Sequence, residues 1–200
     1  MRKFLYLILF VMFASANAQA QSLNDLFRSL IGGSAEASEP AKVVFPSEDE
    51  LLGGWVYKSL DMEYGGSDVL ASMAVAAAKT QLESVAVKFG VTPNSATTPR
   101  VSVERRKITM HRGEQKADAK YTYIPSNGQM IVTAEYNKER YILTAWVSQR
   151  DGGIAVMFSA VELVAIASRT KQYQENATLQ ALGEMVKSYP EIRVGAIFGR

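Results

Sequence analysis

The sequence contains no cysteine and only one histidine, and these scarcities limit what the protein does. Without cysteine there are no disulfides, so the fold depends on its hydrophobic core alone. One histidine and no cysteine leave too few ligands for a zinc site, and no D-x-D-x-D-G run supplies a calcium-binding loop. No glycine-rich loop follows a strand and opens a helix, so nucleotide binding has no support. We therefore expect no metal and no cofactor.

The single histidine, His111, also bears on enzymatic activity. A hydrolase with a serine–histidine–acid triad would have to use it as its general base. It lies in the run TMHRGE, at the edge of a predicted turn, where solvent exposure is more common than a buried catalytic role. We therefore expect a protein that is not an enzyme.

The chain also has little net charge, with 22 Lys and Arg against 20 Asp and Glu. Loss of an N-terminal segment containing Arg2 and Lys3 would leave 20 residues of each sign. A neutral balance lacks the basic stripe that nucleic-acid binding usually needs. The basic triplet Arg105-Arg106-Lys107 falls in a predicted hairpin turn, where it is either a solvated turn or a site for an anion or acidic partner.

No apolar run is long enough to span a bilayer, which takes about 20 residues. The run from Phe4 to Phe13 follows Arg2-Lys3 and precedes small residues, and this order predicts a secretory signal peptide over residues 1–20. Cleavage after Ala18 and after Ala20 both fit the pattern. We expect an exported protein, periplasmic or secreted, that is not lipid-anchored.

Residues 21–45 are expected to form an amphipathic helix followed by a flexible linker. Ser22 is suited to cap a helix that ends before Gly32-Gly33, and the run GGSAEASEPAK after it is rich in small and polar residues. This helix docks on the domain, lies on a membrane surface or contacts an envelope protein partner. Its apolar stripe consists of Leu23, Leu26, Phe27, Leu30 and Ile31.

Residues 46–200 are expected to form one domain that begins with a short helical turn, a strand and a long helix. Ser47 and Glu50 have the spacing of a capping box, which predicts the turn. Alternating residues from Leu51 to Tyr64 predict the first strand, and Ser67 to Phe89 predict the helix, which contains no glycine or proline.

The rest of the domain predicts a meander, two helices and a last strand. From Arg100 to Ser159, six β-rich runs are separated by short turns, so consecutive strands are antiparallel neighbours. Helical patterns follow from Ser159, which has capping-box spacing to Glu162, and over 178–187. With the final run EIRVGAIFGR the total is about eight strands. We expect a mainly β, α+β fold: an antiparallel barrel with helices outside it or across one end.

Gly53-Gly54-Trp55, behind a capped turn and opening the first strand, resembles the G-x-W signature of lipocalins and the wider calycin group. The order of elements is also similar to a lipocalin-like family of secreted bacterial proteins of unknown function. The resemblance implies a barrel base made by Gly53 and Trp55, with an arginine from the last strand over the indole. Arg193 is the first match for that arginine and Arg200 the second.

Inward aromatic and methionine side chains either fill such a barrel or line a ligand site. Alternation places Tyr121 and Tyr123 on one face, and leaves open whether Tyr141 with Leu143 or Thr144 with Trp146 faces inward. The leading hypothesis is an exported, non-enzymatic binding protein for a small apolar or amphipathic ligand. The alternative is a cell-envelope interaction module whose barrel is a filled scaffold. The candidate ligand-binding residues are Tyr57, Tyr121, Tyr123, Met130, Tyr141 and Phe158.

Overall fold

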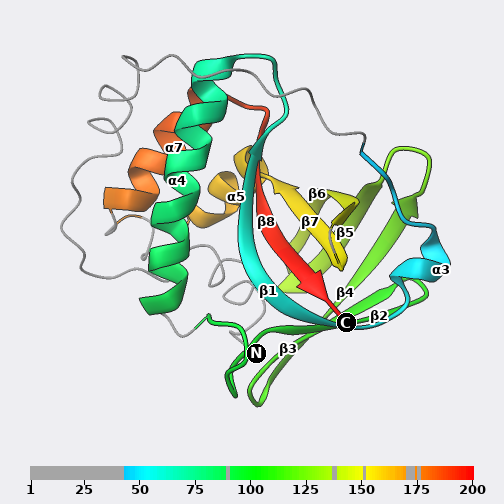
Figure 1. Cartoon of the computed structure of the whole chain (residues 1–200). Helices are drawn as coiled ribbons and strands as arrows, with labels where there is room; N and C mark the ends of the chain where they lie inside the picture. Colours follow the sequence, from blue (N-terminus) through cyan, green and yellow to red (C-terminus); the bar gives the residue numbers. More distant parts are fainter. Residues whose placement is uncertain (1–42, 89–90, 137–138, 151, 170–173, 175–176) are drawn as a thin grey trace.

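The computed structural model describes residues 43–200 apart from 89–90, 137–138, 151, 170–173 and 175–176 (Figure 1). The predicted signal peptide and N-terminal helix lie outside the described residues. The helices are α3 (Glu48–Leu51), α4 (Val69–Lys88), α5 (Ala160–Ala167) and α7 (Ala177–Ser188). The strands are β1 (Gly53–Tyr64), β2 (Arg100–Glu104), β3 (Lys107–Arg112), β4 (Gln115–Ile124), β5 (Gln129–Tyr136), β6 (Glu139–Arg150), β7 (Gly153–Ser159) and β8 (Ile192–Gly199).

The eight strands form a closed antiparallel barrel in sequence order, which confirms the predicted fold. β8 closes the barrel by pairing with β1, from Val56 opposite Gly199 to Tyr64 opposite Ile192, with one irregularity between Tyr57 and Ser59. The six-strand meander from β2 to β7 is joined by tight turns. Positive φ angles occur in these turns at Arg106, Gly113, Gly128 and Gly152.

The turn before β1 has the predicted capping box. The Ser47 hydroxyl accepts a hydrogen bond from the Glu50 amide, and a Glu50 carboxylate oxygen accepts one from the Ser47 amide at 2.7 Å. These hydrogen bonds, that from the Ser47 amide first, lower the pKa of the Glu50 carboxyl. The cap fixes α3, and α3 places the buried side chain of Leu51 directly before β1.

Helix α4 lies in the connection between β1 and β2, and it packs along β1. Lys79 of α4 donates to Asp61 of β1 at 2.8 Å, and Val75 and Leu82 are buried in the core cluster. Asp61 lies between Leu60 and Met62, which are both buried, so it points to the outer face of the strand. A helix therefore covers part of the outer wall, as expected of a barrel with helices outside it.

Helices α5 and α7 pack on each other, and α5 also contacts β6, β7 and β8. Figure 1 shows α4, α5 and α7 gathered on one side of the barrel, with α3 on the opposite side. The Ser159 hydroxyl accepts from the Glu162 amide at 3.4 Å, but the Glu162 side chain does not complete a capping box. The Glu162 carboxylate instead accepts two hydrogen bonds from Thr144 of β6, one from its amide at 2.5 Å and one from its hydroxyl at 2.8 Å. The predicted cap is thus half formed, because its carboxylate joins α5 to the barrel wall.

Candidate functional site

The strand pairing settles which side chains enter the barrel. Paired residues of antiparallel strands share a face, and Val132, which lines the interior, is paired with Leu143. Leu143 and Tyr141 therefore share the inner face of β6. Trp146, paired with Met157, lies on the outer face. The choice that the sequence left open is resolved in favour of Tyr141 and Leu143.

Trp55 closes the α3 end of the interior. Its indole Nε1 donates to the carbonyl of Leu51 at 2.8 Å, and only 6% of the residue is exposed. The guanidinium of Arg200 lies over the ring, with its central carbon 4.8 Å from the ring centre. Arg200 also donates to the carbonyls of Glu50 at 2.9 Å and Leu52 at 3.3 Å. Arg200 thus ties the chain end to α3 and to Trp55.

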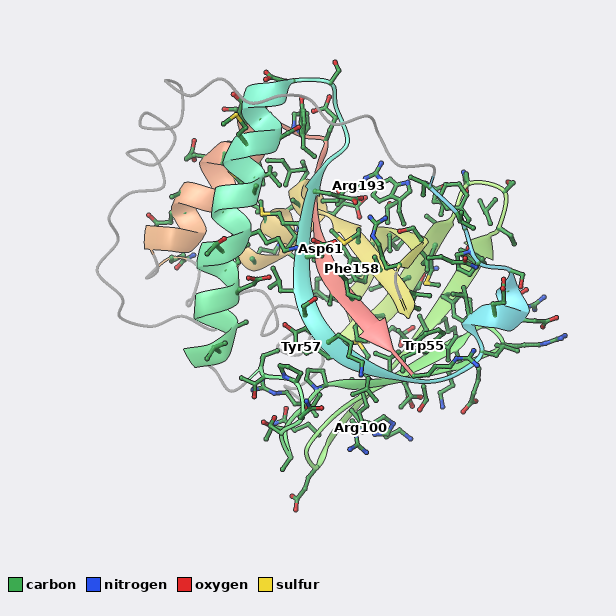
Figure 2. All side chains as sticks on the ribbon, in the orientation of Figure 1. Trp55, Tyr57, Asp61, Arg100, Phe158 and Arg193 are labelled. Atoms are coloured by element: carbon green, nitrogen blue, oxygen red, sulfur yellow. The ribbon has the colours of Figure 1, made fainter. Side chains whose placement is uncertain are left out.

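The assignment of Arg193 to this base was wrong. Arg193 lies at the far end of β8, opposite Glu63 of β1, and its guanidinium stacks over Trp146 at 3.9 Å. Figure 2 shows Arg193 and Trp55 well apart. Because β8 runs antiparallel to β1, the end of β8 meets the start of β1. The second match, Arg200, is therefore the arginine over Trp55.

The barrel encloses a cavity of about 70 Å³. All of its lining residues are apolar: Leu51, Trp55, Val101, Val103, Ile108, Met110, Ala119, Met130, Val132, Val147, Ile154, Val156, Phe158 and Phe198. An apolar cavity of about 150 Å³ stays dry and holds benzene, so this one is about half of that size. Ligand pockets for drug-sized molecules run from about 300 to 1,000 Å³. The interior is a core with a small apolar void.

Only two of the six predicted ligand-binding residues, Met130 and Phe158, line this cavity. Tyr57 is buried and packs edge-on against Phe198 with ring centres 6.4 Å apart. Tyr121 and Tyr123 are also buried, and Tyr141 lines a different pocket. Trp55, predicted to be structural, does line the cavity. The structure therefore does not bring the tyrosines together around one ligand space.

The hydroxyl of Tyr123 makes a structural hydrogen bond and does not face a ligand space. Tyr123 donates to the carbonyl of Pro46 at 2.7 Å, which holds the segment before α3 against β4. Burial raises the pKa of Tyr123 to about 12, and burial with the nearby charge of Glu83 raises the pKa of Tyr57 to about 12. Burial also raises the pKa of Tyr121, although the nearby backbone of Arg106 opposes the shift.

A larger and more open pocket lies at the free edge of β6, between α5 and the residues of β6 that precede Ala145, the first residue paired with β7. We call it the β6–α5 groove; it has a volume of about 490 Å³. Its lining residues come from the start of β6, from α5 and from the turn after α5: Glu139, Arg140, Tyr141 and Ile142, then Glu162, Ala165 and Ile166, then Arg169. Sequence reasoning missed this groove. The run YILTAWV is apolar on both faces of the strand, and this pattern could have indicated that another element packs against the outside of β6.

The single histidine of the sequence lies in the barrel wall. His111 lies within β3, paired with Arg100 and Lys116 on neighbouring strands. Among the described residues, no three His, Cys, Asp or Glu side chains are grouped as metal ligands. Nor does a helix in that part of the chain have the length and apolarity to cross a membrane.

A closed eight-stranded antiparallel barrel, with a tryptophan at its base under an arginine from the chain end, defines a lipocalin-like protein. The chain belongs to the family described as Lipocalin-like domain (DUF4923), whose sequence model matches residues 36–200. The resemblance noted from Gly53-Gly54-Trp55 is thereby confirmed. No curated protein and no solved structure matches the chain significantly.

Proposed function

We propose that this chain is an exported, non-enzymatic binding protein that uses the β6–α5 groove, with the barrel as its rigid scaffold. The observation that carries the proposal is the contrast between two volumes, about 490 Å³ for the groove and about 70 Å³ for the interior. Only the first falls in the usual range of binding pockets. The barrel interior is left with at most a small, wholly apolar guest.

The chemistry of the groove favours an amphipathic helix of a partner protein in the cell envelope. Ile142 and Ile166 supply apolar surface, while Arg140, Arg169 and Glu139 supply charge at its sides. Ile142 is 56% exposed, the most exposed isoleucine in the described part of the chain, and it offers its apolar surface to a partner. Helix-in-groove recognition uses this combination of an apolar floor and charged rims.

Photo-crosslinking in the native envelope tests the proposal. A photoreactive phenylalanine analogue is placed at position 142, and in a matched control at position 124, where Ile124 is a 41% exposed strand residue outside the groove. We expect a discrete adduct from position 142 alone, mapping to an amphipathic segment of the partner. Identical products from both positions, or none from position 142, would contradict the proposal.

A further inference from the structure

The β6–α5 groove presents apolar surface that the described residues do not cover. Ile142 and Val161 are 56% and 41% exposed, and they are two of the six large apolar side chains exposed in the described part of the chain. Val161 precedes Ala165 by one helical turn, so it extends the apolar wall that Ala165 and Ile166 form on α5. Exposed apolar side chains gathered beside one concave site can be covered together by a single docked segment.

We propose that the chain's own segment 22–31 occupies this groove when no partner is bound. Five of its ten residues, Leu23, Leu26, Phe27, Leu30 and Ile31, fall on one stripe at helical spacing. That stripe needs an apolar surface to cover it, and the groove provides one of matching character. The inference rests on the proposed function, because the segment would compete with the partner's helix for the same groove.

The connection is long enough to allow this contact. The described chain begins at Val43, and the Val44 carbonyl accepts from the Gln149 amide at 2.8 Å, which fixes the linker beside the end of β6. Ile142 lies seven residues back along β6, which is about 23 Å at strand spacing. Residues 32–42 span up to about 36 Å when extended and about 17–20 Å on average when flexible.

Charge also suits the segment to the groove. Its polar side carries Asp25 and Arg28, one of each sign. The groove likewise presents both signs, through Arg140 and Arg169 and through Glu139. A short tether keeps such a segment at an effective concentration near the millimolar range, so modest intrinsic affinity suffices. A single basic residue is too few for an anionic membrane to compete strongly.

Hydrogen exchange followed by mass spectrometry tests the proposal on the full chain after signal removal. We expect amides in residues 23–31 to exchange at least about tenfold more slowly than in an unstructured peptide. Ile142→Glu should abolish this protection, because it places a carboxylate on the apolar floor. Ile124→Glu, the same change at an exposed isoleucine outside the groove, should leave it intact.

A second variant distinguishes loss of the docked segment from unfolding of the barrel by Ile142→Glu. Arg169→Glu changes an exposed residue at the groove rim and should also weaken the protection, while slow exchange in β1 and β8 shows that the barrel remains folded. No protection in the unaltered chain, or protection that survives both groove variants, would overturn the proposal. If protection is absent but position 142 still crosslinks a partner in the envelope, the cis contact fails and the proposed function stands. If both are absent, both fall.

Discussion

The guanidinium of Arg200 lies over the indole of Trp55, 4.8 Å from the ring centre, and donates to the carbonyls of Glu50 and Leu52. Arg200→Ala removes the stacking and both hydrogen bonds, so we expect a loss of about 1–2 kcal/mol in the free energy of unfolding. Urea denaturation measures it. Arg105→Ala, which breaks a solvent-exposed pair with Asp49, should cost at most about 0.5 kcal/mol. Equal losses in the two variants would contradict this role for Arg200.

The two glycines before Trp55 should respond differently to alanine. Gly53 has a φ of 115°, a conformation that L side chains rarely adopt, although its Cβ position is free of neighbours. Gly53→Ala should therefore cost about 1–3 kcal/mol through backbone strain alone. Gly54 has no such angle and equal space, so Gly54→Ala should be neutral within about 1 kcal/mol. Thermal unfolding of the pair checks this, and equal shifts would argue against the strained conformation at Gly53.

Tyr57 should make stability fall at alkaline pH. Burial raises its pKa in the folded protein to about 12, above a value of about 10 when unfolded. Its contribution is complete below pH 10 and is lost as pH rises toward 12, because the unfolded chain releases the proton first. We measure the free energy of unfolding by denaturation at several pH values between about 9 and 12. It should fall less steeply with pH for Tyr57→Phe than for the unaltered chain. Parallel curves would show that Tyr57 does not carry this linkage.

Glu162 should hold α5 against the barrel through its two hydrogen bonds to Thr144. Glu162→Ala leaves a partly buried amide and hydroxyl without that acceptor, so we expect a loss of about 2 kcal/mol. Faster exchange of the Thr144 amide should accompany it. Glu184→Ala, which removes an exposed carboxylate paired with Lys187, is the matched control and should change stability by less than about 0.5 kcal/mol.

Much of the fold follows from local sequence signals. The turn residues between β2 and β7 leave consecutive strands no room for a crossover, so antiparallel neighbours are forced. Ser47 and Glu50 define α3 because a capping box is complete within four residues. Helix α4 starts two residues after the predicted Ser67, and the Asp68 side chain accepts a hydrogen bond from the Ala71 amide in its first turn.

The site was less predictable because alternation fixes the face of a side chain and not its depth along the barrel. Tyr121 and Met130 share the inner face, yet only Met130 reaches the cavity. Arg193 was chosen first as the match to an arginine of the last strand, but the antiparallel pairing of β8 with β1 brings the end of β8 to the start of β1, and so points to Arg200. The β6–α5 groove joins segments that only the folded chain brings together, so no local pattern marks it.

Native mass spectrometry of the protein, released undenatured from the envelope, tests most directly whether the barrel interior is a scaffold core and not the binding site. With about 70 Å³ of free space, the interior should hold no lipid-sized molecule, and the account predicts the mass of the bare processed chain or of that chain with a protein partner. A copurified apolar molecule of several hundred daltons, retained by Ile142→Glu and lost on unfolding, would contradict it.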